Sequence, residues 1–591
     1  MHVSRDDDGQ DPKEKINYKA TFRMISGLMM PEKRGFMAAF AWLLLSTAFT
    51  LLSPIIAKYI IDTAIPSKDL RLLIMVVGGL FLNSLLFMGF NYLLQMRLIK
   101  TGQQIMTDLK KRMLARMLSL DLPFYSEYPV GRLTARVQAD TSSLYELFTE
   151  TTVTIFRDML MFVVTFGVMF YFSPRLTLIL SSVFPFALAL SFIFLRKSAS
   201  LFVTVRKLAS EISGFLTEHL NAIALLQAFN REKMAAEKLE AINKRKFDAE
   251  LSGELMMIVF YLSVILLSPV AIAIILGVGG GWAIDRTISI GTLVMFILYI
   301  DKLFEPVFRL SEHISIIQRS FAAGHRIQRI MERRPAIVDG PAPRYIHSIR
   351  EGIEFRNVWM RYADDSPWVL KNISFKLPKG KSLAIVGETG GGKTTVTNLL
   401  FRFYAPQKGK ILIDGVNLSD IGLNSLRTAI GLVHQDIYLF PGTIMQNLKL
   451  MDESIPDSMV HDAIKTIGLE AFFKHHGLSK HIVEKGVNLS AGEKQVISLA
   501  RAMVLNQEVL VLDEATSHID PHTERLINTA MQRLFSRRTM IVIAHRLSTI
   551  LNADNILLVS EGEIKESGTH SQLMEKDGIY SKFYKLQFGE N

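Results

Sequence analysis

Six long apolar runs occupy the first half of this 591-residue chain and decide what it can fold into. They come in three pairs, at residues 36–62 and 71–98, 155–173 and 176–196, and 255–284 and 288–311. Each run is long enough to cross the roughly 30 Å of hydrocarbon in a bilayer as a helix. Buried core helices of a large soluble protein are the alternative, but such helices are usually shorter. The runs therefore predict an α-helical membrane domain with six transmembrane helices.

The composition agrees with a membrane protein. Hydrophobic residues make up 49% of the chain and charged residues only 21%, below the roughly 25% of an average soluble domain. The net charge of +11 suits nucleic acid and an anionic membrane surface equally well. The hydrophobic content favours the membrane, so we expect a lipid bilayer and no nucleic acid as a partner. The absence of cysteine excludes disulfides, thiolate metal sites and cysteine nucleophiles.

The connections between the runs predict the orientation in the membrane. Within a pair they are short, at residues 65–70, 173–175 and 285–287, and between pairs they are long and basic, at about 99–151 and 197–254. By the positive-inside rule, the long connections and both termini are cytosolic, which predicts a multi-pass protein of a cell membrane, plasma or inner. Glycine and proline are sparse in the long connections, so we expect the membrane helices to continue into the cytosol.

The rest of the chain divides by composition. Residues 1–16 read as a polar cytosolic tail, and an interfacial helix at 17–34 begins the membrane domain, which we place at 17–325. Residues 326–350 are polar and contain three prolines, as expected of a linker. Strands and helices then alternate over 351–591, which is typical of an α/β domain.

A glycine-rich loop lies early in this second domain. The strand at 383–386 leads into Gly387-Glu388-Thr389-Gly390-Gly391-Gly392-Lys393-Thr394-Thr395, and a helix is expected to follow. This is the phosphate-binding pattern G-x-x-x-x-G-K-[ST] in its strand–loop–helix setting. We expect Lys393 to reach the β- and γ-phosphates of a nucleotide and the Thr394 hydroxyl to bind Mg²⁺. The domain is therefore predicted to be an α/β P-loop NTPase domain.

Acidic and polar residues follow other apolar strands of this domain. Asp513 is placed to hold Mg²⁺, and Glu514 is the candidate base that polarises the attacking water, although paired acids can also cap a turn. Gln435 and His545 also follow strands, where this fold class binds ligands. Tyr362 could stack on a base. Taken alone, each of these last three residues is more often structural.

Together these residues resemble the ABC transporter family. Residues 351–591 resemble its nucleotide-binding domain, because Leu489-Ser490-Ala491-Gly492-Glu493-Lys494-Gln495 is similar to the family signature and follows the phosphate loop in the family's order. The six preceding spans resemble a half-transporter of the exporter type. Two segments are similar to the cytosolic coupling loops of such exporters: Leu122-Pro123-Phe124-Tyr125, and Gly214 with Glu218. The resemblance therefore puts coupling helices near 122–130 and 214–224.

The resemblance implies residue roles and a partner. Two nucleotide-binding domains of this family enclose two ATP molecules, each held by one chain's phosphate loop and the other chain's signature. Tyr362 would then stack on adenine, Gln435 and Asp513 would serve Mg²⁺, and His545 would contact the γ-phosphate. Ser490 and Gly492 would belong to the nucleotide-binding signature. The cofactors implied are ATP and Mg²⁺, and the partner is a second half-transporter.

Two signature residues depart from the family pattern L-S-G-G-Q. Ala491 replaces a glycine, and its methyl group hinders close approach to phosphate. Glu493 replaces the glutamine and adds a carboxylate near phosphate, which is electrostatically adverse. Because the other catalytic residues are intact, this pattern favours a heterodimer whose partner supplies an intact signature. A homodimer that tolerates both changes is the alternative.

The predicted function is ATP-driven export of a hydrophobic or amphipathic substrate, drug-like or lipid-like, by alternating access. A lipid flippase and an ATP-gated channel or regulator are alternatives built on the same fold, and nothing rejects an importer. Asp301, Glu305 and Arg309 fall in the last span at helical spacing. They indicate either a salt-bridged helix near the cytosolic edge or a cavity that receives cationic amphiphiles.

Overall fold

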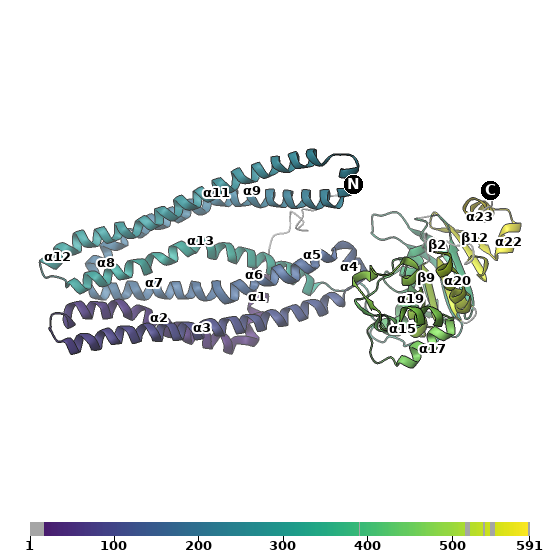
Figure 1. The fold of residues 1–591 in the computed structure, drawn as a ribbon, viewed down its shortest axis with the longest axis horizontal. Helices are drawn as coiled ribbons and strands as arrows, with labels where there is room; N and C mark the ends of the chain where they lie inside the picture. The colour runs from purple at the N-terminus through teal and green to yellow at the C-terminus, as the bar shows by residue number, and fades with distance from the viewer. Residues whose placement is uncertain (1–16, 389, 514–519, 536–537, 544–549, 589–591) are drawn as a thin grey trace. The chain divides into compact units, whose positions relative to one another are not determined.

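The structure, a computed structural model, describes residues 17–388, 390–513, 520–535, 538–543 and 550–588. The chain forms two compact units (Figure 1). The helical unit comprises the chain up to residue 119 together with 129–333, and the α/β unit comprises 120–128 together with the chain from 334 onward. The short helix α4 (Leu122–Glu127) is therefore grouped with the α/β unit, although it lies between helices of the other unit in the sequence.

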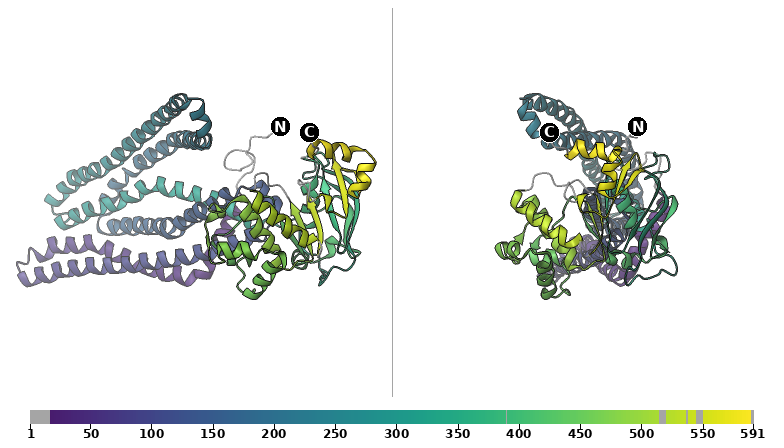
Figure 2. Two further views of the ribbon diagram at one scale, coloured as in Figure 1. Left: turned by 45° about the vertical axis from the view of Figure 1, so that its right-hand side comes forward. Right: turned by 90° about the vertical axis from the view of Figure 1, so that its right-hand side faces the viewer.

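The helical unit is an elongated bundle. Its helices are α1 (Tyr18–Met29), α2 (Lys33–Tyr59), α3 (Leu70–Leu118), α5 (Val130–Ala135), α6 (Thr141–Glu146), α7 (Thr152–Phe172), α8 (Pro174–Ser181), α9 (Phe184–Asn221), α10 (Ile223–Ala228), α11 (Glu232–Ile274), α12 (Gly280–Ile284) and α13 (Ile290–Glu332). Short 3₁₀ and π segments join several of them: η1 (Met30–Glu32), η2 (Ile60–Ala64), η3 (Arg136–Asp140), η4 (Leu147–Thr151) and η5 (Ile275–Gly279). Within this bundle, α9 and α11 lie side by side and diverge from the other long helices towards α10 (Figure 2).

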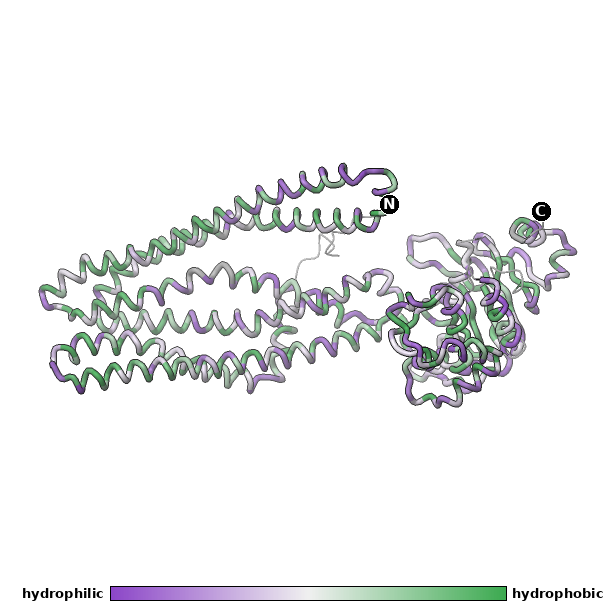
Figure 3. Tube along the Cα trace, viewed as in Figure 1, coloured by the Kyte–Doolittle hydropathy of each residue, from purple (hydrophilic) through white to green (hydrophobic). Residues whose placement is uncertain are grey.

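The long helices extend well beyond a bilayer. With its 49 residues, α3 is about 74 Å long at about 1.5 Å per residue, more than twice the roughly 30 Å of hydrocarbon. The segments of α9 and α11 near α10 are more hydrophilic than the segments near α12 (Figure 3). The prediction that the membrane helices continue past the bilayer as helices is confirmed.

Five helical stretches of the described residues are long and apolar enough to cross a membrane: Tyr18–Ala64, Leu70–Leu118, Val130–Phe172, Pro174–Asn221 and Glu232–Ile284. The sixth predicted span falls in α13, whose first part carries Asp301, Lys302 and Glu305 and is therefore less apolar. This part of α13 packs against α2, α7 and α11 and buries Phe296, Tyr299 and other apolar side chains completely. Charged residues in a membrane helix face such an interior or a cavity rather than lipid.

The short helix between α9 and α11 lies later in the chain than the range in which a coupling helix was expected. Helix α9 continues through Gly214 to Asn221, because one glycine weakens a helix without ending it. The chain turns only at Ala222, and the short helix that follows is α10, which replaces the expected 214–224.

The α/β unit contains three sheets. The six-stranded sheet has the order β12-β11-β3-β10-β9-β6, the four-stranded sheet β2-β1-β4-β5, and a small sheet β7-β8. The strands are β1 (Gly352–Met360), β2 (Leu370–Pro378), β3 (Ser382–Val386), β4 (Lys408–Ile413), β5 (Val416–Asn417), β6 (Ile430–Val433), β7 (Gly442–Thr443), β8 (His481–Ile482), β9 (Val509–Asp513), β10 (Thr539–Ile543), β11 (Asn555–Ser560) and β12 (Glu563–Gly568).

Helices cover this unit: α14 (Lys393–Leu400), α15 (Leu423–Ala429), α16 (Ile444–Leu448), α17 (Asp457–Ile467), α18 (Glu470–His476), α19 (Ala491–Val504), α20 (Pro521–Phe535), α22 (His570–Glu575) and α23 (Ile579–Phe588), with 3₁₀ turns η6 (Leu418–Asp420) and η7 (Glu484–Gly486). The buried strand β3 sends alternate side chains to two cores. Leu383 and Ile385 join one apolar cluster, whereas Ala384 and Val386 join the other. Burial on both faces explains why this strand reads as a continuous apolar run in the sequence.

Candidate functional site

The strand-edge site is formed where parallel strands of the six-stranded sheet end. Strands β3, β10, β9 and β6 are neighbours in this order and run parallel. Strand β3 leads into the glycine-rich loop, β9 ends at Asp513, and β6 is followed by Gln435. Ligands of α/β sheets bind at this edge. Thr389, Glu514 and His545, which the sequence also places here, lie outside the described residues.

Two glycines of the loop occupy positions that no other residue fits well. Gly387 has a φ of +144°, and a Cβ there would lie 1.9 Å from the carbonyl oxygen of Val559. Gly392 has a φ of +99°, and its Cβ would lie 2.6 Å from the Leu370 side chain. Glycine adopts such angles without steric penalty. The loop, which also includes Gly390 and Gly391, can therefore turn tightly from β3 into the N-terminus of α14, which attracts phosphate.

Lys393 is held at the start of α14 by the loop itself. Its Nζ donates hydrogen bonds of 2.8 Å to the carbonyl oxygens of Gly387 and Glu388, and the residue is only 6% exposed. Burial lowers the pKa of the Lys393 ammonium, while the carboxylates of Asp513 and Glu388 oppose that shift. The ammonium therefore lies in the field of Asp513, where it can bind a phosphate oxygen.

Tyr362 lies against the first turns of α14. Its hydroxyl is 2.9 Å from Thr395 Oγ1 and accepts a hydrogen bond of 3.4 Å from Asn398 Nδ2. Its ring meets Tyr404 edge to face at 4.9 Å between centroids and is 47% exposed. An exposed aromatic ring beside the loop can stack on a nucleotide base.

Oxygen donors suited to a divalent cation lie at the same edge of the sheet. The Thr394 side chain is exposed near the start of α14, Gln435 is exposed after β6, and Asp513 ends β9. Hydroxyl, amide and carboxylate oxygens are the ligands that Mg²⁺ prefers. This donor set fits a magnesium ion bound together with phosphate oxygens.

The signature residues lie on a separate helix, α19. Ser490 is its N-cap: the Ser490 Oγ accepts a hydrogen bond of 3.2 Å from Glu493 N, and Glu493 Oε2 accepts one of 2.6 Å from Ser490 N. This reciprocal capping box satisfies two backbone donors of the helix start. Ala491 and the buried Gly492 are the first helical residues. The helix N-terminus that carries Ser490 and Gly492 can attract an anion.

A histidine and a lysine face the carboxylate of Glu493. Its Oε1 lies 3.3 Å from His476 Nε2 and 4.0 Å from Lys480 Nζ. Burial lowers the pKa of the His476 imidazole; Glu493 opposes this shift, and Lys480 and His475 reinforce it. The sequence predicts an unbalanced charge at Glu493, but the fold places Lys480 and a titratable histidine beside it.

Sequence reasoning also missed a half-buried arginine on the signature helix. Arg501 donates hydrogen bonds to the carbonyl oxygens of Asn447 at 3.0 Å and Tyr438 at 3.2 Å. Burial lowers the pKa of its guanidinium to about 10. Arg501 thus joins α19 to the segment that follows Gln435. An arginine on the apolar face of a helix was the signal available in the sequence.

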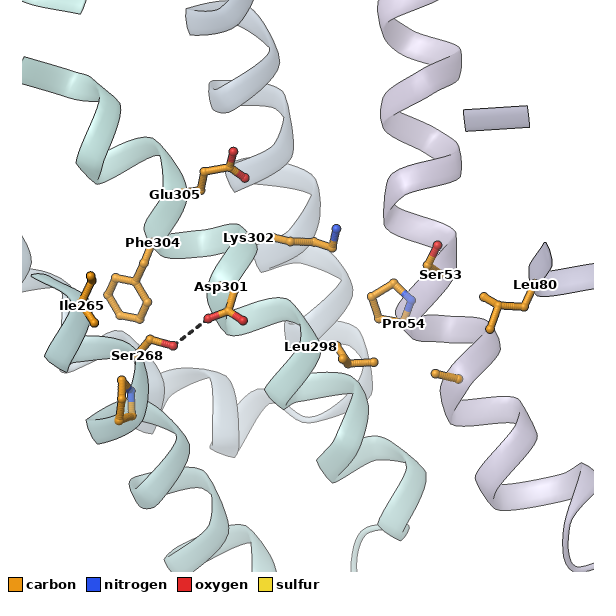
Figure 4. A pocket seen from close by; sticks show the side chains of 12 residues that line it. Ser53, Pro54, Leu80, Ile265, Ser268, Leu298, Asp301, Lys302, Phe304 and Glu305 are labelled. Atoms are coloured by element: carbon orange, nitrogen blue, oxygen red, sulfur yellow. Dashed lines mark hydrogen bonds between the residues drawn. The ribbon is translucent and has the colours of Figure 1, made fainter. Parts of the chain in front are cut away.

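The charged residues of the last span line a cavity in the helical unit. Asp301 and Glu305 on α13 face a cavity of about 880 Å³ between α2, α3, α11 and α13 (Figure 4). Arg309 lies one turn further along and donates a hydrogen bond of 2.5 Å to Glu305 Oε1. The salt bridge predicted from the spacing is therefore present, and the cavity is present as well.

Comparisons with known proteins agree with both units. The family model described as "ABC transporter transmembrane region" matches residues 36–307, and the one described as "ABC transporter" matches 370–517. The probable multidrug resistance ABC transporter ATP-binding/permease protein YheH of Bacillus subtilis (strain 168) is 32% identical over 529 residues, 88% of this chain and 78% of that protein. The ATP-dependent lipid A-core flippase of Syntrophus aciditrophicus (strain SB) is 32% identical over 572 residues, 96% of this chain and 95% of that protein.

A solved structure has a similar fold along nearly its whole length. It is the structure of a bacterial Atm1-family ABC exporter with ATP bound, which is 27% identical. The TM-score is 0.79, and the similarity covers 95% of this chain and 99% of that one.

Proposed function

Because this chain belongs to the ABC transporter family, we propose that its strand-edge site hydrolyses ATP with Mg²⁺ to export a hydrophobic or amphipathic substrate by alternating access. The chain is an integral membrane protein with the exporter fold, and its ATP hydrolysis is coupled to transport. The observation that carries the site assignment is the meeting of the glycine-rich loop, Asp513 and Gln435 at one edge of the sheet. Multidrug and lipid-flippase relatives support the substrate class.

The roles proposed within the site follow from the position of each residue. Lys393 and the loop amides bind the β- and γ-phosphates, and Tyr362 stacks on adenine. Thr394, Gln435 and Asp513 hold Mg²⁺, which neutralises charge on the phosphate oxygens. Glu514 orients and polarises the attacking water, and His545 contacts the γ-phosphate. Closure of the nucleotide-binding domains would act on the membrane helices through α4 and α10.

Glu514→Gln tests the proposed catalytic base. We expect the full chain, with its partner if one is needed, to bind ATP normally but to lose turnover by about 10²–10⁴-fold, the usual contribution of general acid–base catalysis. Nucleotide binding and phosphate release measure the two effects separately. Glu575→Gln, an exposed acid of the same unit, is the matched control. Normal hydrolysis by Glu514→Gln would refute the assignment.

ABC exporters act as dimers, and we propose a heterodimer in which a partner supplies an intact signature to this chain's ATP site. The support is the Ala491 methyl group at the first position of α19. Glu493 supports it less, because His476 and Lys480 face its carboxylate within the chain. We further propose that both termini and the α/β unit are cytosolic, since the long connections between spans are basic.

A further inference from the structure

The cavity in the helical unit is lined by both apolar and charged groups. Apolar lining comes from Leu80, Ile265, Leu298 and Phe304, and polar lining comes from Ser53, Ser268, Asp301, Lys302 and Glu305. Its volume of about 880 Å³ lies within the roughly 300–1,000 Å³ of ligand pockets. All four lining helices belong to the helical unit.

The charged residues lie deep in the span. Asp301 and Lys302 are 11 and 12 residues from Ile290, where α13 begins, which corresponds to about 17 Å along the helix. That distance is about half of the roughly 30 Å of hydrocarbon, too deep for a lysine to reach the headgroups easily. Charges at this depth usually face a cavity and have a partner of opposite charge.

The charges of the cavity are not paired equally. Glu305 is already neutralised by Arg309 at 2.5 Å. Asp301 accepts a hydrogen bond of 2.7 Å from Ser268 Oγ, a neutral donor that leaves its charge uncompensated. Lys302 makes no hydrogen bond and no ion pair within 4.0 Å with any residue in the described ranges, although the carboxylates of Glu305 and Asp301 lie near enough to attract its ammonium. The cavity therefore presents one anion and one cation that are not held in a close ion pair with any described residue.

The two groups point to different sides of α13. In Figure 4, the Asp301 carboxylate lies towards Ser268 on α11, whereas the Lys302 ammonium extends towards α2, which carries Ser53 and Pro54. Successive residues of a helix do not face each other, so Asp301 and Lys302 do not form a pair on the helix surface. A ligand between α2 and α11 could contact both.

Prolines add acceptors around the same cavity. Pro54, Pro269 and Pro306 lie inside the continuous helices α2, α11 and α13. The first two line the cavity, and the third follows Glu305. A proline has no N–H to donate to the carbonyl four residues earlier. In these helices the affected carbonyls are those of Thr50, Ile265 and Lys302. Such carbonyls are tolerated in a membrane where they line a cavity.

We infer that this cavity binds a zwitterionic amphiphile, whose ammonium contacts Asp301 and whose carboxylate or phosphate contacts Lys302 while its tail lies against Leu80, Leu298 and Phe304. This inference rests on the proposed transport function and names its substrate class. It differs from the cationic amphiphile that was one of two alternatives left open by the sequence, because Glu305 is ion-paired with Arg309 and Lys302 has no such close partner among the described residues. A lipid headgroup and a peptide with free termini share this chemistry.

The substrate class is tested by measuring the binding of radiolabelled probes to the purified full chain in a maltoside detergent. The tritiated probes are four single-chain lipids of matched tail: zwitterionic lysophosphatidylethanolamine, anionic lysophosphatidic acid, cationic sphingosine and neutral monoacylglycerol. Trileucine with free termini and its doubly capped form make up the peptide arm. We expect a zwitterion, lipid or peptide, to bind about tenfold or more tightly than its singly charged or neutral counterparts. The inference would be overturned if monoacylglycerol bound as tightly as lysophosphatidylethanolamine and capped trileucine bound as tightly as trileucine with free termini.

Two substitutions should give crossed effects. Lys302→Gln should weaken the zwitterion to the level of sphingosine without weakening sphingosine itself, and Asp301→Asn should weaken the zwitterion to the level of lysophosphatidic acid. Lys68→Gln and Asp285→Asn, exposed residues outside the cavity, are the charge-matched controls. If neither cavity variant changes the ranking, the inference is wrong. If a variant does not fold, the ranking of the probes on the unchanged chain still decides.

The binding assay separates this inference from the proposed function, since it needs no ATP turnover. Retained zwitterion selectivity without ATP-driven transport would count against the transport proposal alone. Transport of amphiphiles without charge selectivity would count against the zwitterionic class alone.

Discussion

At the scale of single residues, Glu493 shows how the fold changes the meaning of a substitution. Considered in the sequence, it is a carboxylate placed where a phosphate should approach. In the structure, one oxygen caps the backbone of Ser490 and the other faces His476 and Lys480. The charge thus belongs to a small network within the chain, and His476 is the member of it that can titrate near neutral pH.

The lowered pKa of His476 predicts how stability depends on pH. Its pKa in the folded chain lies below the ordinary 6.5, so the unfolded chain binds more protons at His476 in the window below 6.5. Its contribution to stability is complete above pH 6.5 and is lost as the pH falls through the folded pKa. We expect His476→Gln to show a smaller acid-induced loss in melting temperature than the unchanged chain, measured by tryptophan fluorescence.

The matched control for this prediction is His347→Gln, which changes an exposed histidine before β1. It should leave the acid-induced loss unaltered. If acid lowers the melting temperature of His476→Gln as much as that of the unchanged chain, then folding does not lower the pKa of His476.

At the scale of elements, a polar clasp joins two membrane helices at one end. The Asp62 carboxylate in η2 accepts hydrogen bonds from Gly291 N at 2.8 Å, Ser289 Oγ at 2.5 Å and Lys58 Nζ at 2.8 Å. A Cβ on Gly291 would lie 2.6 Å from both Asp62 and the Lys58 carbonyl oxygen, so only glycine permits this approach. The clasp fixes the start of α13 against the end of α2, although the two are more than 220 residues apart.

Asp62→Asn should loosen this clasp. The amide keeps one acceptor but loses the charge that Lys58 needs, which should reduce the free energy of unfolding by about 1–3 kcal/mol. Thermal unfolding of the purified full chain in detergent measures the change. Asp285→Asn, an exposed acid in the loop just before α13, should have little effect. Equal melting temperatures for Asp62→Asn and the unchanged chain would show that the clasp does not stabilise the bundle.

At the scale of the whole molecule, the open question is which chain completes the ATP site. The heterodimer proposal predicts that this chain purified alone hydrolyses ATP at a small fraction of the rate of a complete exporter. Phosphate release by the reconstituted lone chain measures this rate. Glu514→Gln in the same preparation gives the background. Robust turnover by the lone chain would remove the argument for a heterodimer and favour a homodimer.

Much of the architecture could be predicted because it depends on local patterns. Apolar runs longer than a bilayer require spanning helices, and five such stretches are present among the described residues. The glycine-rich loop is recognised by the spacing of its residues and by the strand before it and the helix after it. Lys393 lies at the start of that helix and contacts the loop, as the pattern predicts. The position of α10 was missed because the end of α9 has no strong helix breaker, so the boundary depends on packing rather than on sequence.

The chain's own sequence determined its membrane helices, its phosphate loop and its family, since each is encoded by neighbouring residues. Only the tertiary structure decided which distant residues meet: Glu493 with His476, Asp62 with Gly291, and Asp301 with Ser268. Such contacts depend on how separate segments pack, which no local pattern specifies. The charge presented by a buried residue is set by these contacts, and so the ligand of the cavity could be inferred only from the folded chain.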